Sequence, residues 1–425
     1  MLAPQSPFEA YRADLDRFAR RSEFGSADTV WLLLAHCLGR LARVGTGVRE
    51  QLAQQAADAL RDLLEGAEAS DAEGGAEAHF ADLRLIVAGL AVIDTPDGAN
   101  AVSRACRGFA YRMSEAGALS VSYAVLGHAR ACAIQASDRE RGLLAADQAR
   151  VARQLGELES ADELYRVAEL VSARSGDQEL AARASLGRGV LARIQGNYPQ
   201  ARQMLKRGLE MAQAGASPEL QYFAHQGLTI VECVAKRYDL SLQHGWAAFM
   251  LSRGDTTREA ESLSNLAQVC LEAGYPRAAL QAFLGTLARA TVLRVRLASL
   301  GGAALAAGRC GDLAVLSRVA SEIKATVERS ALPYENADTL RHLALAYSAT
   351  GDELNAERYR RAALEIADAK GYHELRLSCD RPEVARTGAA PRPLPLEVES
   401  FELVSSLSAL EPETSEAAFV LTRSG

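Results

Sequence analysis

Apolar residues recur every three or four positions along most of the chain, which is the spacing of one buried face of an α-helix. The pattern is clearest over 340–371, where a turn at Gly351-Asp352 separates two such faces. Gly351 can take the left-handed conformation that ends a helix. We therefore expect a helical hairpin whose apolar positions are Leu343, Ala344, Tyr347, Ala356, Tyr359, Ala363 and Leu364.

The same pattern returns at a nearly constant interval. Its turn residues are separated by 39, 40, 40, 38, 37 and 40 residues, and they are Gly117, Gly156, Gly196, Lys236, Gly274, Gly311 and Gly351. A fixed period of this size is the signature of a solenoid of stacked helical hairpins, here with roughly 17 residues in each helix. The units at Gly196 and Gly274 are the clearest after the last one, and those at Gly117 and Gly311 are degenerate.

The hairpin over 340–371, with small Ala344 and Ala356 where two helices approach, resembles a tetratricopeptide (TPR) repeat. The longer period is similar to the long-helix TPR-like arrays of large bacterial LuxR-type regulators and of peptide-sensing regulators. The resemblance covers 117–371 and extends to the N-terminal residues only by extrapolated spacing. It implies an all-α fold, namely a right-handed α-α superhelix of about nine helical hairpins, with a disordered C-terminal tail.

The chain divides into three parts on this interpretation. We expect degenerate helical hairpins over 1–116, the TPR-like array over 117–380, and a Pro-rich linker with a flexible tail over 381–425. The N-terminal part should contain a helix over 7–21, a helix with Trp31 and an acidic loop over 65–77; Thr95-Pro96 should start another helix. The apolar residues of 401–421 should either dock back into the groove of the array or recruit a partner.

Composition narrows the class of protein. The chain has 48% apolar residues and a net charge of −7, and nucleic-acid binding would usually show a basic face. No run of about 18 apolar residues suggests a membrane span, and the N-terminus has no apolar signal region. The seven scattered cysteines look like buried thiols in a reducing compartment. We therefore expect a cytoplasmic, bacterial protein without direct contact to nucleic acid or membrane.

Signatures of chemistry are missing from the sequence. There is no GxxxxGK[ST], HExxH, CxxC or GxSxG, so we assign no catalytic residue, no cofactor and no metal ligand. Gly301-Gly302 indicates close helix packing more than a phosphate loop, and His36-Cys37 a buried pair more than a metal site. Cys310, beside Arg309, is the one candidate for a reactive thiol.

In TPR arrays the first helix of each hairpin lines the groove, and the resemblance carries ten such positions over as the site. They are Arg150, Arg153, Arg183, Arg193, Phe223, Gln226, Asn265, Gln268, Arg341 and His342. The same positions also include Asp147, Glu261, Glu272 and Asp338. Amide side chains can bond a peptide backbone, and arginine can hold a carboxylate. Each residue can equally be an exposed polar residue of an amphipathic helix.

The function that follows is a protein–protein or protein–peptide interaction module, a scaffold or adaptor without catalytic activity of its own. The alternative is a peptide-responsive regulatory sensor, in which a small peptide tightens the superhelix and the output passes through a partner protein. A remote alternative is an enzyme with a composite site in the groove. The residues do not identify the partner or the oligomeric state.

The repeat register can be tested by overfilling a helix contact. Ala201→Leu or Ala356→Leu should destabilise the protein by about 1–3 kcal/mol, because a packed contact has no room for the larger side chain. Thermal unfolding measures the effect, and an unchanged melting temperature would mean that the register is wrong.

Overall fold

The computed structural model describes residues 77–379 apart from 116–117, 133, 291 and 331, together with 393–408 and a few earlier positions. Those earlier positions are 38, 41, 51, 53–58, 60–62 and 64–65. Several expectations lie outside the described residues. They are the helix over 7–21, Trp31, the His36-Cys37 pair, nearly all of the loop over 65–77, Gly117, the linker over 381–392 and the end of the tail over 409–425.

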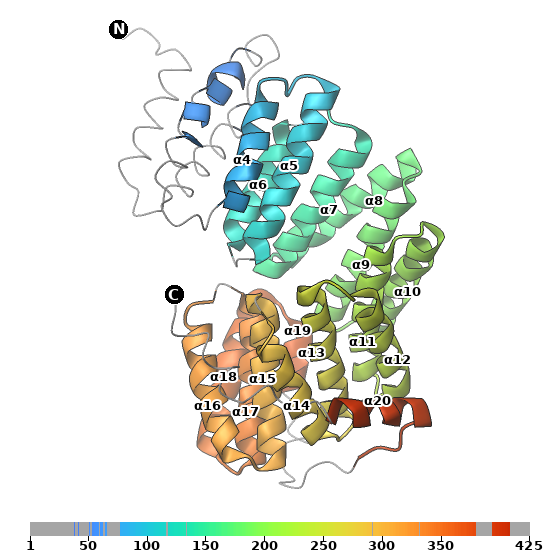
Figure 1. The fold of residues 1–425 in the computed structure, drawn as a ribbon, viewed down its shortest axis with the longest axis vertical. Coiled ribbons are helices and arrows are strands. Elements are labelled where there is room, and N and C mark those ends of the chain that lie inside the picture. Colours follow the sequence, from blue (N-terminus) through green and yellow to red (C-terminus); the bar gives the residue numbers. More distant parts are fainter. Residues whose placement is uncertain are drawn as a thin grey trace. The chain divides into compact units, whose positions relative to one another are not determined.

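Every regular element of the described residues is an α-helix, so the expected all-α fold is confirmed (Figure 1). The helices are α4 (Glu77–Leu90), α5 (Pro96–Glu115), α6 (Leu119–Cys132), α7 (Asp138–Leu155), α8 (Leu158–Ser175), α9 (Gln178–Ile194), α10 (Tyr198–Ala214), α11 (Pro218–Val234), α12 (Tyr238–Leu251), α13 (Thr256–Glu272), α14 (Pro276–Leu287), α15 (Leu293–Cys310), α16 (Leu313–Val327), α17 (Pro333–Ala349), α18 (Glu353–Lys370), α19 (His373–Cys379) and α20 (Val398–Ser408).

Short turns join these helices into hairpins at the expected places. The six turn residues expected within the described chain all have left-handed backbone, and they are Gly156, Gly196, Lys236, Gly274, Gly311 and Gly351. Lys236, the one non-glycine, has φ of 58° and so adopts the conformation that glycine supplies in the other units. The repeat register is therefore confirmed from Gly156 to Gly351.

Helix starts follow from local chemistry in the same way. A polar side chain accepts a hydrogen bond from the backbone N–H three residues on, at Asn197, Ser217, Asp255, Asp312 and Asp352. Such caps satisfy a backbone donor that the first helical turn leaves unpaired. The expected start at Thr95-Pro96 is also confirmed, since Gly98 N donates to Thr95 Oγ1 at 3.1 Å.

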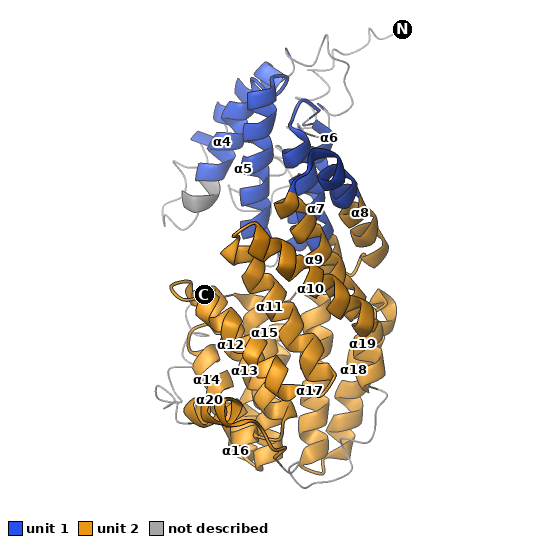
Figure 2. Ribbon diagram, turned by 90° about the vertical axis from the view of Figure 1, so that its right-hand side faces the viewer, with its two compact units in different colours: residues 1–114, 118–151, 167–177 blue, residues 115–117, 152–166, 178–425 orange. Residues whose placement is uncertain are grey.

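The chain forms two compact units, coloured in Figure 2. Unit 1 contains residues 1–114, 118–151 and 167–177, and unit 2 contains 115–117, 152–166 and 178–425. Within unit 1, Phe109 of α5 and Leu126 of α6 are buried, and Ser122 Oγ donates to Ala110 O at 2.7 Å. The domain boundaries expected at 116 and 380 stay a prediction.

Small residues let the helices of unit 2 pack closely. Ala201 is completely buried and Ala356 is 6% exposed, as the hairpin pattern requires. Gly301 and Gly302 lie inside α15, and a Cβ on Gly301 would meet Thr339 Cα of α17 at 3.1 Å. A Cβ on Gly302 would overlap the ring of Phe283 at 2.1 Å. The prediction that this pair serves helix packing is confirmed.

Part of the expected tail is packed on unit 2. Residues 393–397 belong to no helix. The backbone N–H of Leu394 donates to Ala273 O at 3.1 Å, and its backbone oxygen accepts from Tyr275 Oη at 2.8 Å. Helix α20 follows and packs on α14 and α12, with Val404 and Leu407 buried. Because α12 and α14 are the second helices of their hairpins, α20 does not lie in the groove of the first helices, where docking was one expectation.

No helix among the described residues is long and apolar enough to cross a membrane. Five of the six cysteines in the described chain are buried free thiols, in line with the expectation from their spacing, and Cys310 is half-buried.

A matched pair of glycine substitutions tests the packing of α15. Gly308→Ala should destabilise the protein by about 1–3 kcal/mol, because the added Cβ would lie 2.7 Å from the backbone oxygen of Ala346. Gly285→Ala in α14 should instead stabilise by about 0.5–1 kcal/mol, since its Cβ would meet only the end of Arg289 at 3.5 Å and alanine favours helix. Urea unfolding measures both, and equal effects would contradict the packing described here.

Candidate functional site

Polar side chains connect the first helices of successive hairpins in unit 2. Arg183 of α9 pairs with Glu219 of α11 at 3.3 Å, and Tyr222 of α11 donates to Glu261 of α13 at 2.9 Å. Further along, Ser299 Oγ of α15 donates to Ser264 Oγ of α13 at 3.0 Å, and Thr339 Oγ1 of α17 donates to Leu297 O of α15 at 3.0 Å. We call the polar residues that make these contacts the inner face. The name also covers the residues of the three polar clusters described next.

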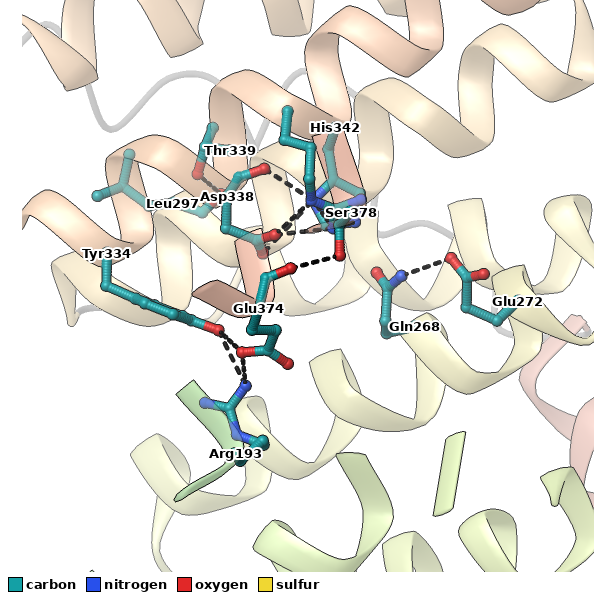
Figure 3. A network of polar contacts seen from close by, with 11 residues as sticks. Arg193, Gln268, Glu272, Leu297, Tyr334, Asp338, Thr339, His342, Glu374 and Ser378 are labelled. Carbon is teal, nitrogen blue, oxygen red and sulfur yellow. Dashed lines mark hydrogen bonds and ion pairs between the residues drawn. The ribbon is translucent and has the colours of Figure 1, made fainter. Parts of the chain in front are cut away.

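Arg193 joins the beginning of this array to its end (Figure 3). Its Nη1 donates to Glu374 Oε2 of α19 at 2.5 Å and to Tyr334 Oη of α17 at 2.9 Å. Tyr334 Oη in turn donates to Glu374 Oε2 at 2.6 Å. Arg193 and Glu374, which are 7% and 6% exposed, lie 181 residues apart in sequence. We call this three-residue cluster the closing contact, because it brings α9 against α17 and α19.

The charge of Arg193 is maintained by its partners. Burial disfavours the cation, but the carboxylate of Glu374 and the hydroxyl of Tyr334 outweigh that cost, and the pKa of Arg193 is raised above its usual value. Burial, together with the neighbouring Glu374 carboxylate, raises the pKa of Tyr334. At neutral pH the cluster is therefore a cation, a carboxylate and a neutral hydroxyl that satisfy one another.

Packing at two turns accompanies the closing contact. A Cβ on Gly156 would lie 2.7 Å from both Tyr372 Oη and Lys370 Cδ, so the turn before α8 contacts the end of α18. Similarly, a Cβ on Gly196 would lie 3.5 Å from Leu377 Cδ1 of α19. The array of unit 2 is thus closed by apolar and backbone contacts as well as by the ion pair.

A second cluster lies on α17. Arg341 donates to Asp338 Oδ1 at 2.7 and 3.0 Å and to His342 Nε2 at 3.0 Å. The same Arg341 Nη2 lies 3.4 Å from His342 Nδ1, and Nδ1 lies 2.9 Å from the backbone oxygen of Asp338. A guanidinium cation this close to the ring disfavours a second positive charge there. Burial acts in the same direction: desolvation, and then the Arg341 cation, lowers the pKa of His342 to about 4.

Glu261 of α13 is the centre of a third cluster. Tyr222 and Arg294 both donate to its carboxylate, Arg294 with its two guanidinium NH2 groups. Burial alone would raise the pKa of Glu261, but Arg294 and the hydrogen bonds lower it below its usual value. Gln226 extends the cluster by donating to Tyr222 Oη and to Ser262 Oγ, each at 2.9 Å, and it accepts from Asn265. This arrangement is built to hold a carboxylate.

Glu335 of α17 differs from these carboxylates. Its Oε2 has no hydrogen-bond partner among the described residues, and the same holds for the hydroxyl of the fully buried Tyr372. Burial raises the pKa of Glu335 above its usual value. Since burial explains this shift, we assign Glu335 no catalytic role.

Nine of the ten residues expected in the groove belong to unit 2, and Arg150 belongs to unit 1, where it donates to Ser114 Oγ at 3.1 Å. Seven of the nine form hydrogen bonds or ion pairs within the chain, namely Arg183, Arg193, Gln226, Asn265, Gln268, Arg341 and His342. Phe223 is 37% exposed and stacks on Arg258, and Arg153 is half-buried with Nε unbonded in the described chain. Their role in binding stays a prediction.

The sequence analysis did not single out several residues of these clusters, among them Tyr222, Arg294, Tyr334 and Glu374. Two of their hydrogen bonds could have been predicted from the repeat. Tyr222 and Glu261 are 39 residues apart, and Tyr334 and Glu374 are 40 residues apart, which is one repeat period. Arg193–Glu374 carries no such signal, since it joins units far apart along the array.

Other candidate chemistry gains no support. Burial raises the pKa of the Cys310 thiol, which disfavours the reactive thiolate. In the part of the chain that the structure describes, no three His, Cys, Asp or Glu side chains are grouped to hold a metal ion. His225 and His244 approach to 3.0 Å between their Nδ1 atoms, but they are a pair alone.

No protein-family model matches the chain, and no curated protein sequence matches it. Among solved structures, it is similar to a Signal Transduction ATPase with Numerous Domains (STAND) protein with a tetratricopeptide repeat sensor from Pyrococcus horikoshii. The identity is 13% and the TM-score 0.45, over 89% of this chain and 56% of that one. This chain therefore spans just over half the length of that protein.

The buried His342 makes stability depend on pH. The pKa of His342 is about 4 in the folded protein, whereas its ordinary value, taken for the unfolded chain, is 6.5. Between pH 4 and pH 6.5 the unfolded chain therefore binds a proton that the folded chain does not. Stability should therefore be lost as pH falls from about 6.5 to 4, by on the order of 3 kcal/mol from this residue.

His342→Gln should make this loss distinctly smaller, as measured by urea unfolding between pH 4 and 7.5. The exposed His373→Gln serves as the control. An unchanged pH slope in His342→Gln would contradict the neutral, buried state of the ring.

Proposed function

We propose that the chain is a helical-repeat interaction module that binds a partner protein or peptide through the inner face and has no catalytic step of its own. The observation that carries this proposal is that the inner face already holds carboxylates. Arg183, Arg193 and Arg294 bind Glu219, Glu374 and Glu261, respectively. Guanidinium groups in this arrangement are suited to the carboxylates of an acidic peptide.

The inner face is polar, but its central residues are covered. Arg193, Gln226 and His342 are each less than a tenth exposed, so a peptide reaches them only if unit 2 opens. Opening means separating Arg193 from Glu374, and an incoming carboxylate can replace Glu374 at the same guanidinium. The exchange conserves the ion pair, so it avoids leaving a buried charge without a partner.

This requirement favours a second candidate, a ligand-responsive regulator. A ligand that binds only the opened state shifts the population toward it by as much as its affinity differs between the two states. The specific observation in favour is the closing contact, because it is one localised interaction between distant parts of the chain. Release of α19 would be the change that a partner protein senses.

Glu374→Gln tests both candidates. The variant should be destabilised by about 3–5 kcal/mol, since it removes the charge that compensates buried Arg193. It should also bind an extended glutamate-rich peptide more tightly than the native chain does, because Arg193 no longer has an internal carboxylate. Fluorescence anisotropy of the labelled peptide measures affinity, and hydrogen exchange of the α19 amides should accelerate when the peptide binds the native chain.

Glu357→Gln is the matched control, since Glu357 pairs with Arg360 at the exposed surface of α18 at 2.7 Å. It should change neither stability nor peptide affinity appreciably. If Glu374→Gln and Glu357→Gln bind the peptide equally, the inner face is not the binding site. If the peptide binds without faster exchange in α19, unit 2 has not opened, and both the regulator and binding at Arg193 are excluded.

A further inference from the structure

Beside α20 lies a cleft of about 660 Å³. Its apolar lining comes from two helices of the array, α12 and α13, and from α20 itself, namely Leu242, Trp246, Phe249, Leu263, Leu403 and Leu407. We call it the α20 cleft. It is formed largely by the second helix α12 and the start of α13, so it is distinct from the inner face.

The lining presents aromatic surface to solvent. Trp246 is 45% exposed and stacks on Phe249 with ring centroids 5.5 Å apart. Large exposed aromatic side chains around a hollow are typical of protein interaction sites. The cleft is of the size that accepts one or two large apolar side chains.

This part of unit 2 already binds one helix. Helix α20 packs against α14 and α12 (Figure 1). Its buried residues, Ser400, Val404 and Leu407, are spaced as one helical face. Laying an amphipathic helix in a groove is a general mode of peptide recognition. The cleft beside α20 continues the same surface, so a second helix there would pack against both α12 and α20.

The charged residues around the cleft indicate what kind of partner would fit it. Three carboxylates line it, those of Glu259, Glu399 and Glu402, against the single cation of Arg289 in the lining, and Glu259 pairs with Arg253 at 3.7 Å. Glu399 and Glu402 are exposed on α20, and no ion pair is found for their carboxylates within the described residues. The chain's own continuation is a poor match, since residues 409–425 contain three glutamates and one arginine. Complementarity therefore favours a basic segment from another protein.

We propose that the α20 cleft is a docking site for a basic amphipathic helix of a partner protein. Its apolar face inserts a large side chain beside Trp246, and its lysine or arginine side chains pair with Glu399 and Glu402. This site goes beyond the binding of an acidic peptide at the inner face, and it has the opposite charge preference. The two proposals therefore stand or fall separately.

The test uses the full chain and a fluorescein-labelled helical peptide with leucine on one face and lysine on the others. Fluorescence anisotropy should show binding, with the affinity falling as salt is added. Two reference peptides are needed, one with glutamate in place of lysine and one with the same composition in scrambled order. Both should bind at least about tenfold more weakly, a difference of roughly 1.4 kcal/mol.

Two charge-reversal variants locate the site. Glu399→Lys/Glu402→Lys should weaken binding of the lysine peptide about tenfold or more, because two attractive contacts become repulsive. Glu210→Lys/Glu365→Lys makes the same change of net charge at exposed positions of α10 and α18 and should keep the affinity within about twofold. Trp246→Ala, with circular dichroism confirming the fold, should also weaken binding.

Three results would overturn the proposal. An equal loss of affinity in the two charge-reversal variants would show that the cationic peptide adsorbs to the acidic protein through net charge alone. Equal binding of the scrambled peptide would exclude recognition of a helical face. Unchanged affinity in Trp246→Ala would place any binding outside the α20 cleft.

Discussion

The buried ion pair between Arg193 and Glu374 is the interaction on which the arrangement of unit 2 depends. Hairpins in a solenoid contact only their neighbours, so stacking alone does not bring distant repeats together. Here α9 meets α17 and α19, and the two charges are taken out of water at the meeting point. Such a pair is tolerated because each charge has its partner and Tyr334 supplies a further hydrogen bond.

Because α9 contacts α17 and α19, the polar side chains of the first helices do not line an open groove. In an open array their side chains would line a solvent-filled groove, as the family resemblance implies. In this chain the same side chains bond to one another at intervals of about one repeat, such as Tyr222 with Glu261 and Arg183 with Glu219. The arginines of the inner face therefore already hold carboxylates of the chain itself, and the acidic peptide proposed above would have to replace them.

The second helices carry a different surface. Helix α12 is largely apolar and receives α20, whose free glutamates leave an acidic margin around exposed Trp246. The two faces of the hairpins thus differ in chemistry, with arginines inside and carboxylates around an apolar cleft on the second helices. Under the two proposals, one acidic and one basic partner would bind at separate surfaces and would not compete.

The repeat, its turns and its close packing could be predicted from sequence because each depends on local properties. Left-handed backbone at Gly156 or Gly351 and the absence of a Cβ at Gly301 follow from residue type and helical spacing. The polar positions of the first helices could also be placed, because they recur with the period. Tertiary structure alone decided that Arg193 meets Glu374 and that Val404 and Leu407 of α20 pack on α12 and α14. Those contacts depend on small rotations between successive hairpins, which accumulate over several repeats. The accumulated rotation cannot be predicted from the spacing of residues within one repeat.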